Sequence, residues 1–162
     1  MDLDRKACAA AWGSYLATLP PEHPHRARRP TAFAFGDEPA LADELGALVM
    51  AGRKRATTSL AIQYTSLNLP LPTAFDLSII LAGNGQPCAI IERTQVTTLA
   101  FEDVDAPYAA IEGEGDCSLA SWRAAHERYF AGVCARLGGH CDARTPVLCQ
   151  VFQVVWVKPD AG

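Results

Sequence analysis

The chain has 162 residues, of which 49% are hydrophobic and 20% are charged, and its formal net charge is −4. This balance is typical of a globular domain with its own core and excludes a wholly disordered chain. The negative charge excludes a protein that coats nucleic acid non-specifically. No run approaches the ~18 apolar residues of a membrane span, so we expect no membrane association.

Charge is unevenly distributed along the chain. Residues 1–55 carry 8 of the 14 Lys and Arg and 7 of the 18 Asp and Glu, a net of +1, so residues 56–162 carry −5. Basic residues cluster at Arg26–Arg29 and Arg53–Arg55, and acidic residues cluster at Glu102–Asp105 and Glu112–Asp116. Such runs are ordinarily solvated surface charge. The alternative is a local anion-binding site on an acidic protein.

Localisation and redox state are predicted from the N-terminus and the cysteines. Asp2 and Asp4 interrupt the basic leader that a secretion signal requires, so we expect a cytoplasmic protein. The cysteines are scattered and form no Cys-x-x-Cys pair, and we expect them to be buried free thiols. They are Cys8, Cys88, Cys117, Cys134, Cys141 and Cys149.

The first part of the chain reads as two helices joined by a proline-rich linker. Apolar residues at helical spacing predict a helix over residues 3–19, and Pro20–Pro30 reads as a loop. Asp37 is the predicted N-cap of a second helix that ends at Gly52. We therefore expect an N-terminal helical extension and linker over residues 1–30, followed by one domain over residues 31–162.

The second part reads mainly as strands with one long helix. Predicted strands cover Ala56–Ile62, Leu77–Leu81, Cys88 to about Leu99, and Val147–Val157, and Asn84-Gly85 predicts a hairpin turn. We read Phe101–Asp116 as loop with a short helix near Tyr108–Ile111, and Ser118 as the cap of a helix that runs to Leu137. This order predicts an α+β fold with a small mixed sheet or open barrel and helices at its ends.

Three segments carry candidate chemistry. In the first, Gly52-Arg53-Lys54-Arg55-Ala56-Thr57-Thr58, the cations complement the end of the preceding helix dipole. A lysine beside a second cation loses proton affinity, so Lys54 is also a candidate base or phosphate ligand, and Thr57 a candidate nucleophile or hydrogen-bonding partner. The segment lacks the glycine-rich lead of a nucleotide-phosphate loop.

The second segment, Glu112-Gly113-Glu114-Gly115-Asp116, alternates acids with glycines before the long helix. It is either a flexible loop whose Asp116 or Ser118 caps that helix, or a tight turn that directs one carboxylate inward for acid–base work.

The third segment is Trp122-Arg123-Ala124-Ala125-His126. His126 lies on the apolar stripe, where a satisfied core histidine is the ordinary interpretation. Arg123 is either a surface charge or a group that grips a phosphate or stacks on a base. A Ser118–His126–Asp116 relay and a zinc site of His126, Cys134, His140 and Cys141 match no recurrent motif, and we predict no metal and no cofactor.

Taken together, these segments resemble the ASCH domain family, within the wider PUA-like group, and its longer bacterial branch in particular. The resemblance covers roughly residues 33–157. It rests on Phe35-Gly36-Asp37, Ala42–Leu45, Gly52–Leu60, Leu71-Pro72, Asp76, Ile90–Glu92, Glu112–Asp116, Ser118-Leu119, Trp122-Arg123, His126 and Pro146-Val147. It implies a PUA-like small mixed or antiparallel β-barrel flanked by helices, with a cleft that faces RNA or a nucleotide-like ligand.

The resemblance also implies candidate site residues. One small bacterial branch resembles amidohydrolases that deacetylate acetylated cytidine with a Lys, a Thr three residues later and a Glu. Lys54 and Thr57 match that spacing, Glu112 matches the Glu, and Glu114 is the alternative. Ribonuclease activity is associated with the longer branch. The remaining expected ligand contacts are Arg53, Arg55, Arg123 and His126.

The expected function is therefore binding of RNA, a nucleotide or a nucleoside, with hydrolysis by a Lys54–Thr57–Glu112 site in the enzymatic case. There Lys54 acts as base, Thr57 as nucleophile or water-positioning hydroxyl, and Glu112 as acid or base. Two functions without catalysis also fit the sequence: an RNA-binding module, and a protein-interaction module that uses the N-terminal helix and linker. Two residues depart from the family: Arg55 replaces a frequent Thr, and Phe75 replaces a Gly before Asp76.

Overall fold

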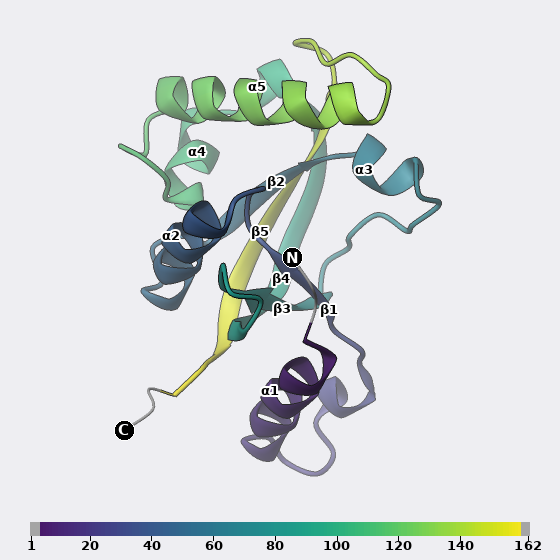
Figure 1. Ribbon diagram of the computed structural model, residues 1–162, viewed down its shortest axis with the longest axis vertical. Helices are drawn as coiled ribbons and strands as arrows, with labels where there is room; N and C mark the ends of the chain where they lie inside the picture. The colour runs from purple at the N-terminus through teal and green to yellow at the C-terminus, as the bar shows by residue number, and fades with distance from the viewer. Residues whose placement is uncertain (1–3, 160–162) are drawn as a thin grey trace. The chain divides into compact units, whose positions relative to one another are not determined.

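The computed structural model describes residues 4–159, which form an α+β fold as predicted (Figure 1). A five-stranded mixed sheet has the order β1-β3-β4-β5-β2. The strands are β1 (Thr31–Ala34), β2 (Ala56–Leu60), β3 (Leu77–Leu81), β4 (Pro87–Ala100) and β5 (Pro146–Val157). The helices are α1 (Arg5–Ala17), α2 (Pro39–Met50), α3 (Ile62–Thr65), α4 (Ala106–Glu112) and α5 (Leu119–Arg136), with short 3₁₀ turns η1 (Pro24–Ala27) and η2 (Phe101–Asp103). No helix of residues 4–159 is long and apolar enough to cross a membrane.

The described chain divides into two compact units, and β4 and β5 contribute residues to both. Unit 1 holds residues 4–52, 75–92 and 153–159, and unit 2 holds residues 53–74 and 93–152.

Unit 1 is built on β3. This strand pairs with β1 in parallel and with β4 in an antiparallel hairpin whose Gly85 has a φ of 79°. That positive φ is what the Asn84-Gly85 signal predicts, because glycine has no Cβ to clash there. The N-terminal helix belongs to the same core, since Cys8 and Tyr15 of α1 pack in one cluster with Leu77 and Ile79 of β3.

Unit 2 is built on the antiparallel pair of β2 and β5 and on helices α4 and α5. Along β2 buried and half-buried residues alternate, which is the two-residue period of a strand with one covered face. Leu60 of β2, Val147 of β5 and Trp122 of α5 share one apolar cluster. All the site residues discussed below belong to this unit.

The capping signal of the long helix is confirmed and that of the second helix is wrong. Ser118 accepts a hydrogen bond from the Ser121 N–H at the start of α5. By contrast, α2 begins at Pro39, and its N-cap is Glu38, not Asp37. Proline fixes the φ of a first helical residue, so it determined this start more strongly than the Asp37 carboxylate.

Several short elements escaped the sequence prediction. Strand β1 was not predicted, the expected strand over Ala56–Ile62 ends at Leu60 and turns into α3, and the linker Pro20–Pro30 contains η1. The short helix predicted near Tyr108–Ile111 is confirmed as α4, which is longer than predicted and whose N-cap Asp105 accepts from the Tyr108 N–H. Elements of four residues carry too few side chains to show a period.

The prediction that every cysteine is a free thiol is wrong for two of them. Cys134 and Cys141 form a disulfide, with Cα atoms 6.1 Å apart. Cys134 lies in the last turn of α5 and Cys141 in the loop that follows, and the turn at Gly138 brings this loop back toward the helix. Among residues 4–159 the other cysteines are free: Cys8, Cys88 and Cys149 are buried, and Cys117 is half-buried.

Candidate functional site

The first candidate segment and the acidic glycine loop lie against each other in unit 2. The Arg55 N–H donates to the Ile111 carbonyl at 2.9 Å. A Cβ on Gly113 would lie 2.3 Å from the Arg53 carbonyl oxygen, so only glycine fits this approach. Gly113 also has the left-handed φ of 74° that ends α4. The two backbones are therefore in contact, although the segments are far apart in the sequence.

This contact brings the Lys54 ammonium to two carboxylates of the acidic loop. Nζ of Lys54 lies 3.5 Å from Oε1 of Glu112 and 2.5 Å from Oε1 of Glu114. It also donates to the Ala56 carbonyl at 2.9 Å. Glu112 and Glu114 thus both contact Lys54. The sequence predicted Glu114 only as an alternative to Glu112 for the single expected Glu.

Glu112 is the centre of a larger buried cluster. Its Oε2 accepts from the Thr58 hydroxyl at 2.9 Å and from the Trp122 indole N–H at 2.5 Å. Nε2 of His126 lies 3.2 Å from its Oε1. Each carboxylate oxygen therefore has at least two partners, as a buried carboxylate requires.

The surroundings of His126 favour an imidazolium. Its Nδ1 lies 2.9 Å from the Trp122 carbonyl oxygen and its Nε2 faces Glu112, so both ring nitrogens face acceptors. Burial lowers the pKa of His126, but the Glu112 carboxylate outweighs burial and raises it above the usual value. With His126 protonated, the cluster contains two cations and two carboxylates and is neutral overall.

The same interactions act on Glu112 in the opposite direction. Burial alone would raise the pKa of Glu112, but the Lys54 charge, His126 and the Trp122 indole together lower it to about 2. Glu112 is therefore ionised throughout the neutral range. An ionised carboxylate accepts a proton or orients a cation, and it does not serve as an acid.

Neighbouring threonines on β2 have different surroundings. Thr58 is buried and faces Glu112, whereas Thr57 is half-buried and, by strand alternation, lies on the other face of β2. The Thr57 carbonyl accepts from the Tyr108 hydroxyl at 2.8 Å. The structure thus brings Lys54 and Glu112 together and places the predicted Thr57 on the opposite face of β2 from Thr58.

The remaining predicted contacts divide into exposed and engaged groups. Arg53 and Arg55 are exposed. Arg123 is half-buried, and its Nη2 donates to the carbonyls of Glu102 and Val104, so it holds the η2 turn against α5. His126 is engaged within the cluster. Ligand contacts by these residues stay predictions.

Solvent reaches the cluster only at its edge. The Lys54 side chain is 0% exposed and Glu112 is 1% exposed, whereas the Glu114 side chain is 25% exposed. Glu114 therefore covers the ammonium on its outer side.

Sequence reasoning did not find three members of the cluster: Thr58, the Tyr108 hydroxyl, which lies 3.0 Å from the Thr58 hydroxyl, and the Trp122 indole as a donor. Thr58 and Trp122 lie within the candidate segments, and the period of each element could have placed them beside Glu112.

Neither the Ser-His-Asp relay nor the zinc site is formed. Ser118 caps α5, His126 is engaged with Glu112, and two of the four zinc candidates, Cys134 and Cys141, form the disulfide. Within residues 4–159 no three His, Cys, Asp or Glu side chains form a metal-binding group.

The fold and this cluster, built from the Gly52–Thr58 segment, the acidic glycine loop and the Trp-Arg-x-x-His helix, define an ASCH-type domain of the PUA-like α+β class. The family model of the ASCH domain matches residues 31–156, and the chain belongs to this family.

Two solved structures resemble the chain over most of its length. An ASCH domain from Lactobacillus crispatus JV V101 is 29% identical, has a TM-score of 0.88 and covers 93% of this chain and 95% of its own. A protein from Enterococcus faecalis V583 is 31% identical, has a TM-score of 0.81 and covers 92% of this chain and 88% of its own. Among curated proteins none matches this chain.

Proposed function

We propose that this protein binds RNA or a nucleoside derived from it and hydrolyses the bound molecule at a site formed by Lys54, Thr57 and Glu112. The observation that carries the proposal is the contact of one buried ammonium with two carboxylates, 58 and 60 residues away in the chain. A buried ion pair adds little net stability compared with apolar packing. A buried carboxylate in a cleft whose pKa is strongly shifted by a charge partner, as that of Glu112 is by Lys54, is typical of functional sites.

Substrate entry requires Glu114 to leave Lys54. Glu114 is the most exposed acidic member, and it lies between Gly113 and Gly115, both with positive φ. Glycines on both sides let the backbone rearrange there at low cost. An acyl or phosphoryl oxygen of a substrate would then replace the Glu114 oxygen on the Lys54 ammonium.

Each residue then has a defined role. Lys54 stabilises the negative charge that develops on the substrate oxygen. Glu112 is ionised, so it orients Lys54 and accepts a proton. Of the two roles expected for it, base rather than acid is therefore proposed. The expected role of Thr57 is to attack the substrate or to position the attacking water, although Thr57 lies on the other face of β2 from Thr58 and Glu112, and the valine substitution below tests this role. Arg53 and Arg55 are exposed beside Lys54 in the sequence and would contact the phosphates of an RNA.

The test is turnover of a panel of RNAs and of acetylated cytidine, with Thr57→Val and Thr58→Val as a matched pair. Thr57→Val should lower the rate by about 10²–10⁴-fold at unchanged stability. Thr58→Val should lower stability, because Glu112 loses a buried donor. Turnover by Thr57→Val at the wild-type rate would show that Thr57 has no catalytic role.

The second candidate is a non-catalytic RNA-binding module. It is favoured by the closure of Lys54 and Glu112 to solvent, in contrast to the exposed Arg53 and Arg55. It predicts salt-dependent RNA binding without any product, weakened by Arg53→Ala across all sequences. Binding without turnover on the whole panel would decide for this module.

A further inference from the structure

The disulfide between Cys134 and Cys141 lies in unit 2, outside the Lys54–Glu112 cluster. We propose that this pair is a reversible thiol–disulfide site that reacts with low-molecular-weight disulfides such as oxidised glutathione. In its oxidised form it holds the loop of residues 141–145 in place, and through this loop it supports the packing around Glu112. The proposal does not depend on the proposed hydrolysis.

The two sulfurs differ in accessibility, which sets the order of reaction. Cys134 is 3% exposed and belongs to the apolar cluster, whereas Cys141 is half-buried in the loop. The Cys141 thiolate therefore attacks the small disulfide and releases one glutathione thiolate. The Cys134 thiolate then attacks Cys141 of the mixed disulfide and releases the second. Two electrons pass from the protein to glutathione, and the two thiol protons end on the released glutathiones.

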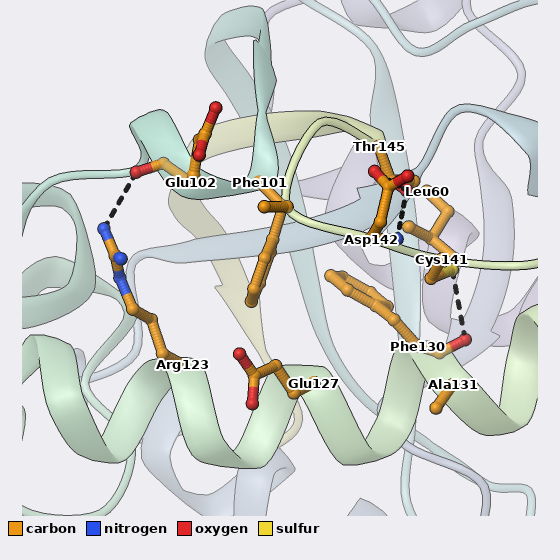
Figure 2. A pocket seen from close by; sticks show the side chains of 11 residues that line it. Leu60, Phe101, Glu102, Arg123, Glu127, Phe130, Ala131, Cys141, Asp142 and Thr145 are labelled. Carbon is orange, nitrogen blue, oxygen red and sulfur yellow. Dashed lines mark hydrogen bonds between the residues drawn. The ribbon is translucent and has the colours of Figure 1, made fainter.

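The loop can hold the pair together in either redox state. The Gly139 N–H donates to the Cys134 carbonyl at 2.8 Å, which brings the chain back along α5. Sγ of Cys141 lies 3.5 Å from the Phe130 carbonyl oxygen, which would accept the S–H of a reduced Cys141 (Figure 2). Reduction therefore leaves Cys141 with one hydrogen bond, which keeps it within reach of Cys134 for reoxidation but restrains the loop less than the covalent bond does.

The loop beyond Cys141 is hydrogen-bonded to the η2 turn. The Phe101 N–H donates to the Thr145 carbonyl and the Glu102 N–H donates to the Ala143 carbonyl, both at 2.9 Å. Asp142 and Thr145 also bond to each other within the loop (Figure 2). A covalent tie at Cys141 thus restricts the segment that positions Phe101.

Phe101 connects this segment to the cluster. Its ring stacks on Trp122 with centroids 5.5 Å apart, and the Trp122 indole donates to Glu112. The Trp122 ring in turn stacks on His126 at 4.2 Å. Loosening of the loop would therefore be transmitted by direct packing to the imidazole that contacts Glu112.

The same loop forms one wall of a pocket of about 340 Å³, whose opposite wall is α5 (Figure 2). Cys141, Asp142, Ala143 and Thr145 line the loop side, and Arg123, Glu127, Phe130 and Ala131 line the helix side. The redox state of the pair would thus also set the shape of this pocket.

Three of the four free cysteines compete little with the pair. Burial holds the pKa values of Cys8 and Cys88 above the usual value and raises that of Cys149 to about 12, so these thiols form little thiolate. In the reducing cytoplasm that the sequence predicts, a disulfide is typical of a redox-responsive site and not of a permanent cross-link.

The chemistry is tested on the full chain equilibrated in buffers of reduced and oxidised glutathione, quenched with acid and alkylated after denaturation. Intact mass and peptide mapping should show six labelled cysteines when reduced and four when oxidised, with Cys134 joined to Cys141. Cys117→Ser is the control and should still form the pair, whereas Cys141→Ser should not. Six labelled cysteines at every glutathione ratio would overturn the proposal.

The structural consequence is tested by hydrogen exchange of the oxidised and reduced wild-type chain. The Phe101 and Glu102 amides should exchange about tenfold or more faster after reduction, and the imidazole resonances of His126 should shift. Amides in β3, in unit 1, serve as the internal control. Equal exchange at Phe101 and Glu102 in both states, with unshifted His126 resonances, would show that the pair does not support the cluster.

Discussion

Nζ of Lys54 and Oε1 of Glu112 lie 3.5 Å apart with both side chains closed to solvent. Two buried charges are stable only while each keeps its partner of opposite charge. Mutation or titration of either partner should therefore change the stability of the protein.

Glu112→Gln should be strongly destabilising. The substitution keeps the shape of the side chain but leaves the buried Lys54 and His126 with a single carboxylate between them. Loss of one partner of a buried pair costs about 3–5 kcal/mol. Chemical denaturation of the variant measures this loss, with the exposed Glu44→Gln as a control that should change stability by less than about 0.5 kcal/mol. A loss below about 1 kcal/mol for Glu112→Gln would mean that the cluster is not held by charge.

Stability should decline on both sides of neutrality. The pKa of His126 is raised on folding, so its contribution is complete below the unfolded value near 6.5 and is lost as pH rises through the folded pKa. The pKa of Glu112 is lowered to about 2, so its contribution is present above 4.5 and is lost as pH falls toward 2. Thermal melting as a function of pH measures both limbs.

His126→Gln should flatten the alkaline limb of that profile and move the acid limb toward higher pH, because His126 helps to lower the pKa of Glu112. The exposed His140→Gln is the matched control and should keep the wild-type profile. An alkaline limb unchanged in His126→Gln would assign the pH dependence to a group outside the cluster.

Glu114→Gln should open the site without unfolding it. Glu114 is a quarter exposed, so its loss costs much less than the loss of Glu112. With the outer carboxylate neutralised, Lys54 should attract anions more strongly, and we expect inorganic phosphate to bind several-fold more tightly by calorimetry. Glu44→Gln, exposed on α2, is the control. Equal phosphate affinity in wild type, Glu114→Gln and Glu44→Gln would refute the role of Glu114 as the group that covers Lys54.

Phe75→Gly should stabilise the protein. Phe75 has a φ of 72° and is 66% exposed, so its backbone strain is not offset by burial of the ring. Glycine removes the Cβ clash, a gain of up to about 1 kcal/mol after the entropy of the more flexible unfolded chain is counted. Phe75→Ala keeps the Cβ and should show no such gain in thermal melting. Equal effects of Gly and Ala would show that the gain comes from loss of the ring.

Phe75 and Arg55 are the two residues at which the sequence departs from the family pattern, and the structure accommodates them differently. The expected glycine before Asp76 is Phe75, and the backbone there keeps the left-handed conformation that favours glycine. Arg55, in place of a frequent threonine, is exposed, and its backbone N–H and C=O bond to Ile111 and Phe152. Its charge therefore lies outside the buried cluster.

Local signals predicted the elements they control. The Asn84-Gly85 turn and the Ser118 cap of α5 act over a few residues, and both are confirmed, as is the strand predicted over Val147–Val157. Strand β1 lacked such a signal, because it is only four residues long and its conformation depends on pairing with the distant strand β3. The Cys134–Cys141 pair likewise depends on how the loop after α5 folds back.

By itself, the sequence determined the family, the α+β class and the two segments that contain Lys54 and Glu112, because residue types and spacing are properties of the chain. Only the tertiary structure decided that Glu112 and Glu114 both contact Lys54, that Thr58 and not Thr57 bonds to Glu112, and that Glu112 raises the pKa of His126. The physical reason is burial. Which face of a strand is covered, and which charges share a site without water, are settled only when distant segments pack together.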